Sequence, residues 1–192
     1  MDSRARLRHP GRVTRARPLA LLLALLAGNA LAAPAYYPYS PGTKWRYSNG
    51  ETQVVGQPRV VKGVTVTPLS HSFGGKVVSE DLLELRAGGV FLRGSQVAGR
   101  LIWYEPALTL YPASPLLPGI TWQSASGRLS LGGRVMGQEA VQNAAGAFNA
   151  LVIRTEVNSG AGAASAQFSD FVPGVGVVRF VSANGQAVDL LK

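Results

Sequence analysis

The chain has 192 residues, of which 46% are hydrophobic, with 19 Lys or Arg against 10 Asp or Glu. It contains no Cys, which excludes a disulfide framework and any thiolate metal centre. An excess of basic residues is typical of nucleic-acid-binding proteins, but six of the arginines lie within the first 17 residues, directly before an apolar run.

The first 32 residues have the layout of a secretory signal peptide. Six Arg and one acid precede the apolar run 19–28, and Ala30, Leu31 and Ala32 follow as an A-x-A cleavage site. A spanning helix needs roughly 20 apolar residues, so an uncleaved anchor is the weaker alternative. No Cys follows the run, so we expect no lipid attachment. We predict a signal peptide over 1–32 and one secreted or periplasmic domain over 33–192, peripheral to the membrane at most.

Removal of residues 1–32 changes the meaning of the charge. The remaining chain has 13 basic and 9 acidic residues, a net charge of +4, and its basic residues occur singly. We therefore expect no nucleic-acid partner. About 160 residues are enough for one domain with its own hydrophobic core.

Two related segments begin with a Pro-Gly turn and lead into a strand that carries a Trp: 41–45 and 118–122. In each turn, Pro sets the second residue and Gly accepts a positive φ at the third, which is typical of a type II turn. A third turn is expected at Pro173 and Gly174. We predict that Trp45 and Trp122 are equivalent core anchors, and that replacing either by Ala lowers the melting temperature by similar amounts.

From Tyr36 onward, short β-branched and aromatic runs are broken by Gly, Pro, Asn or Ser every eight to twelve residues. Apolar and polar residues alternate with a period of two, as in half-buried strands, over 64–67, 83–86, 128–131 and 151–157. This spacing is compatible with an antiparallel sandwich, a barrel or a strongly curved sheet. We predict an all-β fold: a curved antiparallel sheet or half-barrel.

The chain divides into two similar halves, 37–105 and 116–183. Trp45 and Trp122 lie 77 residues apart, and Gly-initiated strands follow each of them in the same order. This indicates a duplication, although antiparallel β proteins often repeat such short motifs. Four prolines mark 106–118 as a connection that crosses over or runs along a sheet edge. The Gly-, Ala- and Ser-rich stretch 158–166 is expected to form a long hairpin loop.

Taken together, four motifs resemble a widespread family of secreted or lipid-anchored bacterial β proteins. Its domain opens with aromatic-Pro-Leu-x-x-Gly-x-x-Trp-x-Tyr, here the stretch 37–47. A second Gly-x-x-Trp motif matches 116–122, a Gly-initiated strand matches 143–148, and a final aromatic-x-Pro-Gly-Val-Gly-x-Val motif matches 171–178. Ala144 and Ala147 depart from the Pro and Thr of the third motif. The resemblance implies a lipoprotein-carrier or lipocalin-like curved sheet, with no established enzymatic activity.

Few residues are candidates for chemistry. His71 is the only His after residue 32, and a metal or acid–base site needs several partners, so we predict a surface side chain whose replacement by Ala changes little. We expect the acidic cluster to be a solvated strand face; a glycosidase would need a second carboxylate across a cleft, from Glu105 or Asp170. This cluster consists of Glu80, Asp81 and Glu84.

Ser126 and Ser130 lie in no Gly-x-Ser-x-Gly motif, so serine hydrolysis has no support. We therefore predict a protein that is not an enzyme and has no cofactor or metal.

Aromatic residues crowd the start of the predicted domain and either line a pocket or attach the first strand to the core. Packing is favoured for Trp45 and Tyr47, and both alternatives remain for the others. The group consists of Tyr36, Tyr37, Tyr39, Trp45 and Tyr47. The functional hypothesis is an exported β domain that binds a hydrophobic ligand or an envelope component. The alternative is a structural or protein-interaction module of the envelope without a ligand cavity.

Overall fold

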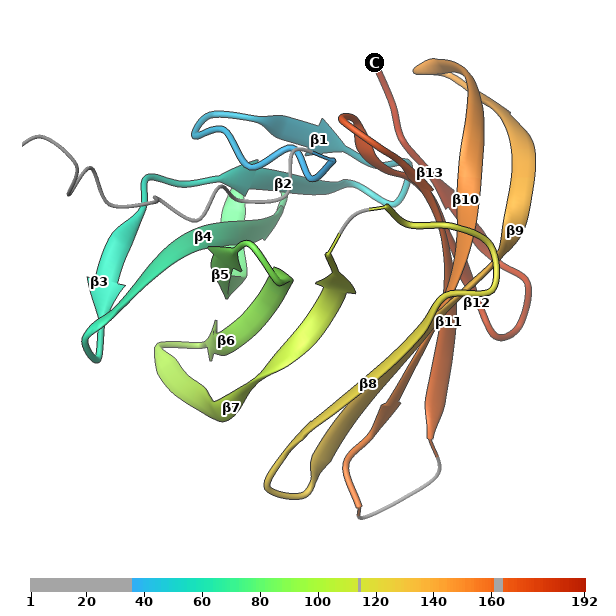
Figure 1. Ribbon diagram of the computed structural model, residues 1–192. Coiled ribbons are helices and arrows are strands. Elements are labelled where there is room, and N and C mark those ends of the chain that lie inside the picture. Colours follow the sequence, from blue (N-terminus) through green and yellow to red (C-terminus); the bar gives the residue numbers. More distant parts are fainter. Residues whose placement is uncertain (1–35, 114, 161–163) are drawn as a thin grey trace, which may run out of the picture. The chain divides into compact units, whose positions relative to one another are not determined.

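The computed structural model describes residues 36–113, 115–160 and 164–192 (Figure 1). The predicted signal peptide, 1–32, lies outside the described residues. Within them the chain forms thirteen strands and no helix, so the all-β prediction is confirmed. Accordingly, the described part contains no helix with the length and apolarity needed to cross a membrane.

The first half of the described chain builds sheet 1, in which all neighbouring strands are antiparallel. The strand order is β1-β2-β4-β5-β6-β7, and β3 pairs with β4 beside this path. The strands are β1 (Lys44–Arg46), β2 (Glu51–Val55), β3 (Arg59–Val61), β4 (Val64–Phe73), β5 (Lys76–Arg86), β6 (Gly89–Val97) and β7 (Arg100–Pro112).

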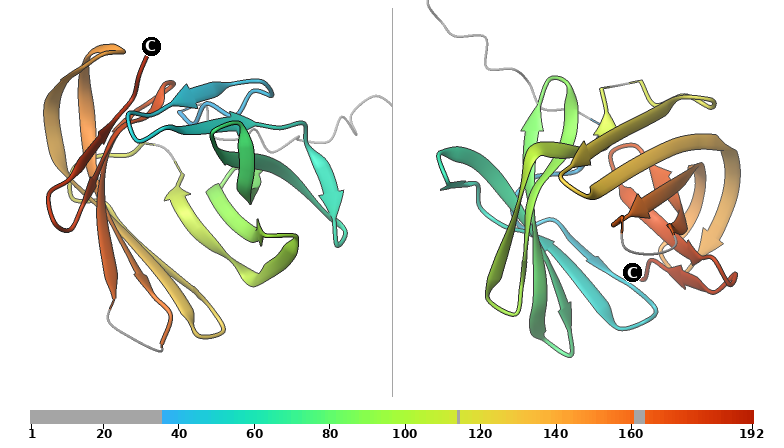
Figure 2. Two further views of the ribbon diagram at one scale, coloured as in Figure 1. Left: turned by 180° about the vertical axis from the view of Figure 1, so that it is seen from behind. Right: turned by 90° about the horizontal axis from the view of Figure 1, so that it is seen from below.

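The second half builds sheet 2, an antiparallel meander in the order β13-β12-β11-β10-β9-β8. Figure 2 shows the two sheets from two further sides. The sequence predicted one curved sheet, whereas the structure has two. The strands are β8 (Thr121–Ser126), β9 (Leu129–Asn143), β10 (Gly146–Asn158), β11 (Ser165–Val172), β12 (Gly176–Ser182) and β13 (Ala187–Asp189).

Segments rich in Pro or Gly lie where their composition predicts. β7 is the edge strand of sheet 1 and contains Pro106 and Pro112, because an edge strand tolerates a missing N–H. The chain then passes to sheet 2, where β8 begins at Thr121. The stretch 158–166 lies at the β10–β11 hairpin, where Val157 pairs with Ser165, and residues 161–163 of this loop lie outside the described residues.

All three Pro-Gly turns form as predicted. Gly42, Gly119 and Gly174 have φ angles of 90°, 92° and 79°, as the third position of a type II turn requires. Each turn is closed by a backbone hydrogen bond, from Thr43 to Ser40, from Ile120 to Leu117 and from Val175 to Val172.

The first two turns also make the same contacts with a later strand. Gly42 N–H donates to the carbonyl of Val55 at 2.8 Å, and Val55 N–H donates back to Thr43. In the second half, Gly119 N–H donates to Val135 at 2.8 Å, and Val135 donates back to Ile120. This match is what a duplication predicts, although the duplication itself stays a prediction.

Between the sheets lies one apolar core, to which both contribute buried side chains such as Val55, Leu69, Ile153 and Phe171. The apolar face of each sheet is therefore covered by the other. Along one edge the sheets are joined by backbone contacts at the ends of β1 and β13. Just after β1, Tyr47 bridges Leu190, and Ser48 N–H donates to Asp189 at 2.8 Å.

Side-chain hydrogen bonds join the other edge. Thr109 N–H in β7 donates to the hydroxyl of Ser124 at 2.7 Å, and Glu105 N–H donates to the hydroxyl of Ser126 at 2.8 Å. Ser126 is thus engaged in linking the sheets.

The opening motif docks on the final motif of the chain. Trp45 is 7% exposed, and its indole N–H donates to the carbonyl of Val175 at 2.7 Å. Tyr47 is 2% exposed, and its hydroxyl donates to the carbonyl of Val177 at 2.9 Å. Gly176 leaves room for the Trp45 ring, since a Cβ there would meet it at 3.1 Å. These contacts connect sheet 1 to sheet 2 and confirm that Trp45 and Tyr47 pack in the core.

Trp122 differs from Trp45. It packs against the same core but is only partly buried, and its Nε1 has no hydrogen-bond partner among the described residues. Its ring lies over Gly133, where a Cβ would come within 2.1 Å of Cζ2. The two tryptophans therefore follow equivalent turns without occupying equivalent environments.

Candidate functional site

A half-buried ion network lies on the inner face of sheet 1. Nδ1 of His71 lies 2.7 Å from Oε1 of Glu51, and Nε2 lies 3.3 Å from Oδ2 of Asp81. The imidazole is 19% exposed, Glu51 15% and Asp81 33%. Asp81 also accepts a hydrogen bond from the hydroxyl of Ser95 at 2.9 Å. Both ring nitrogens therefore face a carboxylate.

Strand register brings these three residues together. In the β2–β4 ladder, His71 pairs with Gln53, and in the β4–β5 ladder Leu69 pairs with Asp81. Paired residues share a face, and so do residues two apart on a strand. Glu51, His71 and Asp81 consequently stand on the face that also carries the core residue Leu69.

Electrostatic attraction decides the charge of His71. Burial alone lowers the pKa of this imidazole, but the hydrogen bonds and Coulomb attraction of Asp81 and Glu51 outweigh burial and raise the pKa to about 9. The hydrogen bond from His71 in turn lowers the pKa of Glu51, against its own burial. At neutral pH the network is an imidazolium between two carboxylates.

The prediction of a surface histidine is wrong. His71 is 19% exposed and has two charged partners, because neighbouring strands supply acids that lie 20 and 10 residues away in the sequence. Glu51 was not among the candidates, because a single acid in a short strand has no distinguishing pattern. Glu51 lies two residues before Gln53 and therefore on the same face of β2. This position places Glu51 near His71 only once it is known that Gln53 pairs with His71 in the β2–β4 ladder.

This network borders a groove with a volume of about 460 Å³, to which sheet 1 and sheet 2 both contribute. His71 and Glu51 lie on one wall, and Phe180 and Val188 supply the apolar part of the other. The remaining lining residues are polar and lie in or next to β2, β11, β12 and β13: Asn49, Gln53, Gln167, Ser182 and Gln186.

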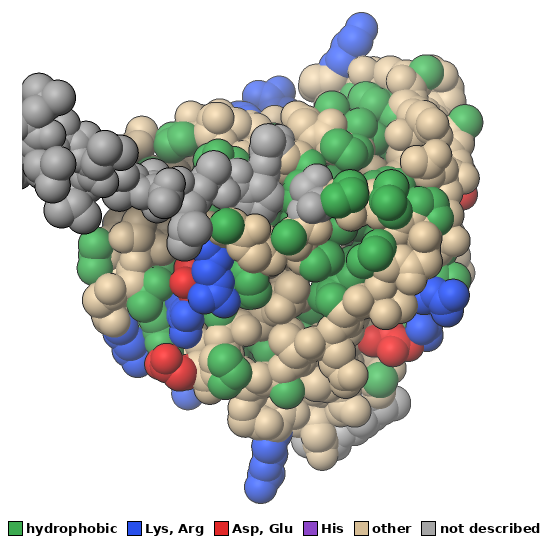
Figure 3. Space-filling view, viewed as in Figure 1, with side chains coloured by type: hydrophobic (Ala, Val, Ile, Leu, Met, Phe, Trp, Pro, Cys, Tyr) green, Lys and Arg blue, Asp and Glu red, His purple; other side chains and the backbone are tan. Residues whose placement is uncertain are grey.

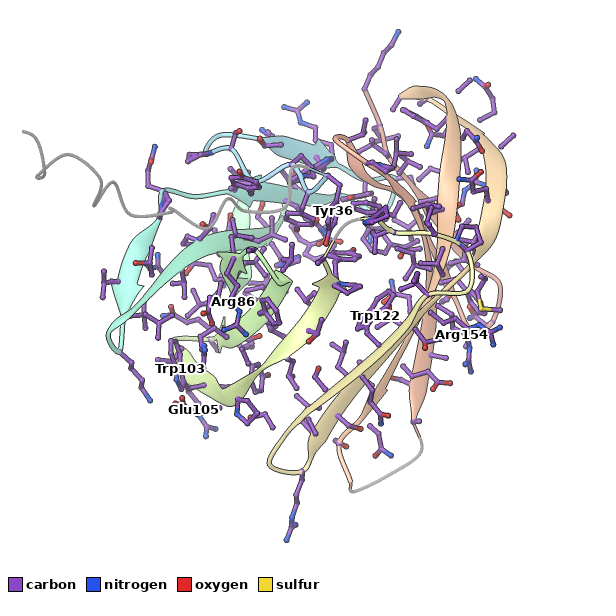
Figure 4. The ribbon with its side chains drawn as sticks, in the orientation of Figure 1. Tyr36, Arg86, Trp103, Glu105, Trp122 and Arg154 are labelled. Atoms are coloured by element: carbon purple, nitrogen blue, oxygen red, sulfur yellow. The ribbon has the colours of Figure 1, made fainter. Side chains whose placement is uncertain are left out.

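The acidic cluster of β5 is half-buried and paired, so the prediction of a solvated face is wrong. Glu80 lies 2.5 Å from Arg59, and Glu84 lies 2.6 Å from Arg93. Arg93, 8% exposed, also lies 3.6 Å from Glu105 and 5.8 Å from the centroid of the Trp103 ring. Figure 4 shows Trp103 and Glu105 beside each other on sheet 1. Glu84 and Glu105 thus meet around one guanidinium, and Arg86, 3.4 Å from Glu84, balances the second negative charge.

Asp170 belongs to a different environment. It lies in β11 of sheet 2 and is 2% exposed. Burial raises its pKa to about 6, and the nearby charge of Glu139 adds to this, while Arg179 acts in the opposite direction. None of the three acids of β5 is among these charged neighbours. Of the two carboxylates that the sequence offered as a glycosidase partner, the structure therefore brings only Glu105 near the β5 cluster, where it and Glu84 both pair with Arg93.

The N-terminal aromatic residues pack rather than line the groove. Tyr36 is 8% exposed and Tyr37 9% exposed. The Tyr36 ring meets Phe171 edge-on at 6.1 Å, and the Tyr36 hydroxyl donates to the carbonyl of Pro112. Tyr39 is partly buried against the same core. The structure therefore favours attachment of the chain start to the core.

We expect the His71 network to make stability depend on pH. Because the folded pKa of His71, about 9, lies above its unfolded value of 6.5, its stabilisation is complete below pH 6.5 and is lost as the pH rises through 9. The lowered pKa of Glu51 acts in the acidic range. Its stabilisation is present above pH 4.5, the unfolded pKa, and is lost as the pH falls through the lower pKa of the folded state. His71→Gln should therefore destabilise by an amount on the order of 2 kcal/mol between pH 5 and 6.5.

Urea unfolding of the wild type and of His71→Gln at a series of pH values checks this. The difference between the two free energies of unfolding should shrink as the pH rises from 6.5 to 10. A difference that stays constant over this range would show that His71 does not carry a proton in the folded state.

No protein-family model matches the chain, and no curated protein sequence matches it. Among solved structures, it is similar to a "putative exported protein with YmcC-like fold" from Bacteroides fragilis NCTC 9343. The identity is 13%, the match covers 83% of this chain and 98% of that chain, and the TM-score is 0.42.

Proposed function

We propose that this chain is an exported, non-enzymatic β domain that binds a polar, hydroxyl-rich component of the cell envelope in the groove beside His71. The observation that carries the proposal is the His71 network. An imidazolium is held half-buried between two carboxylates, and with one of them, Glu51, it lines a groove of about 460 Å³. Burying charges is costly, so perturbed ionisable groups in a cleft mark a candidate binding site.

Groove chemistry favours a ligand with many hydroxyl groups. The amides of Gln167 and Gln186 each combine a donor and an acceptor, which is the combination that a hydroxyl group matches. Gln53, whose Nε2 donates to Glu51 at 2.9 Å, adds its amide oxygen as an acceptor. Phe180 and Val188 add a small apolar surface on which the C–H face of a sugar ring can lie. An envelope glycan combines both properties.

A purely hydrophobic ligand has less support. The inner faces of both sheets are apolar, but they cover one another. Their buried side chains, which include Val55, Leu69 and Phe171, pack in this core and are therefore not available to a ligand. In the groove only Phe180 and Val188 remain apolar. Of the two ligands that the sequence suggests, the envelope component is therefore the better match.

His71 is also poorly suited to catalysis. Each of its nitrogens donates a hydrogen bond to a carboxylate, which leaves no lone pair to abstract a proton or to bind a metal ion. This arrangement supports a binding role for the site.

A two-arm titration tests the proposed function. Amide NMR spectra of the purified protein are recorded with soluble oligosaccharides released from the producing cell's envelope, and separately with its lipid extract in detergent. We expect the oligosaccharides to shift the signals of Gln53, Gln167 and Gln186, and Gln186→Ala to weaken binding about tenfold. Gln142→Ala, outside the groove, should bind as the wild type does. Binding confined to the lipid arm would contradict the proposal.

Exposed apolar side chains favour the alternative, a module that binds an envelope protein. The connection between the sheets exposes Leu117 (54%) and Ile120 (38%). Figure 3 shows hydrophobic side chains gathered on the face along which this connection runs in Figure 1. Exposed apolar surface of this kind is typical of contact sites between proteins. Crosslinking in intact cells from a photoreactive residue at position 117 separates this alternative from ligand binding.

A further inference from the structure

The outer face of sheet 2 carries a regular array of polar side chains around a glycine. In the registers of β8, β9 and β10, Gln123 and Glu156 both pair with Gly132. Two residues after Gly132 in β9, Arg134 pairs with both Thr121 and Arg154. Two residues before Gly132, Ser130 pairs with Asn158. Paired residues and residues two apart share a face, so all of these flank Gly132 on one side of the sheet.

Gly132 leaves a hollow of about 350 Å³ at the centre of this array. Lining residues include Gln123, Ser130, Arg134 and Arg154. Trp122 and Gly133 of the same strands also line the hollow.

No internal contact demands a glycine at position 132. A Cβ there would meet only the carbonyl oxygen of Trp122 at 3.6 Å, an ordinary contact, and its φ is not positive. The adjacent Gly133 contrasts with it, since a Cβ at that position would lie 2.1 Å from the Trp122 ring. Glycine weakens the interior of a strand and often marks the close approach of another molecule. The missing side chain of Gly132 therefore points to a ligand.

Charges around the hollow favour an anion. Arg134 and Arg154 stand directly opposite each other, an arrangement that repulsion destabilises. Arg154 forms an ion pair with Glu156, whereas Arg134 has no ion-pair partner among the described residues. An added carboxylate or phosphate would relieve the repulsion and can accept two hydrogen bonds from one guanidinium.

From this geometry we infer a second binding site, around Gly132 on the outer face of sheet 2, for a ligand that bears a carboxylate or phosphate group on a hydroxyl-rich frame. Arg134 pairs with the anionic group. The hydroxyl groups of the ligand receive hydrogen bonds from, or donate them to, four polar side chains: Thr121, Gln123, Ser130 and Asn158. The site is separate from the groove beside His71 and does not depend on the function proposed for that groove.

The experiment uses three probes of similar size: glucuronate, inorganic phosphate and neutral glucose. Titration of the purified protein, followed by amide NMR, should show that glucuronate shifts the signals of Gln123, Gly132 and Arg134, with affinity at least about tenfold above glucose. Phosphate that binds as tightly as glucuronate identifies the anion as the main determinant. Weaker phosphate binding shows that the sugar frame contributes. Either result supports the site.

Variants locate the binding. Gly132→Val should abolish it by filling the hollow, whereas Gly137→Val, another open strand glycine of β9 outside the hollow, should not. Arg134→Gln should weaken glucuronate binding about tenfold, and Arg100→Gln should leave it unchanged. Equal binding of glucose and glucuronate, or unchanged binding by Gly132→Val, would overturn the inference. Signals of the His71 groove report on the other site in the same spectra.

Discussion

Replacing Trp45 by Ala should lower the free energy of unfolding by about 3–5 kcal/mol. The ring is 7% exposed, and its N–H donates to the carbonyl of Val175 across the two sheets. The substitution removes a large buried aromatic surface, opens a cavity beside Gly176 and leaves the Val175 carbonyl without its donor. With no disulfide in the chain, this is a large part of the roughly 5–15 kcal/mol that stabilises a domain.

Trp122→Ala is the matched comparison. Trp122 also follows a Pro-Gly turn, but it is only partly buried and its Nε1 has no hydrogen-bond partner among the described residues. We expect a clearly smaller loss, so the equal effects that the sequence suggests should not be found. Urea unfolding of both variants measures the difference, and Trp45→Phe shows how much comes from the hydrogen bond. If the Trp45→Ala protein were as stable as the wild type, this would contradict the conclusion that Trp45 connects the two sheets.

Gly133→Val should lower the free energy of unfolding by about 1–3 kcal/mol, the range of an overpacked core site. A Cβ at position 133 would lie 2.1 Å from Cζ2 and 2.2 Å from Cε2 of Trp122. The indole is rigid and packs against the core, so it has to leave its position or push β8 away from β9. The near-ultraviolet circular dichroism of Trp122 should change together with the loss of stability.

Gly132→Val provides the control, because it makes the same chemical change one residue away in the same strand. A Cβ at position 132 has space, and Val is favoured in strands, so stability should be unchanged or slightly increased. Equal destabilisation by both variants would indicate a general intolerance of β9 to branched residues. A stable Gly132→Val protein also ensures that its loss of glucuronate binding is not a folding defect.

Local patterns accounted for much of the fold. Alternation with period two needs only neighbouring residues, and it predicted strands such as 151–157, which lie within β10. The Pro-Gly pairs set backbone angles within their own turn, so all three turns were confirmed, at Gly42, Gly119 and Gly174. The four prolines between 106 and 118 predicted a crossing or an edge position, and the structure has both, because β7 with Pro106 and Pro112 is an edge strand and the chain then passes to sheet 2.

By contrast, the candidate site depends on which strands become neighbours. Glu51, His71 and Asp81 form a network only because β4 pairs with β2 on one side and with β5 on the other in a particular register. The same applies to Gly132, whose hollow needs the registers of three strands.

Taken by itself, the sequence determined the all-β class, the turns and the positions of most strand segments, since these depend on interactions between residues close in the chain. Only the tertiary structure decided that there are two sheets, that Trp45 is buried more deeply than Trp122, and that His71 is a charged, half-buried residue. These properties arise from contacts across strands and between sheets. Such contacts add burial and electrostatic energy that no local pattern contains, so the same Pro-Gly-x-x-Trp motif can lead to two different environments.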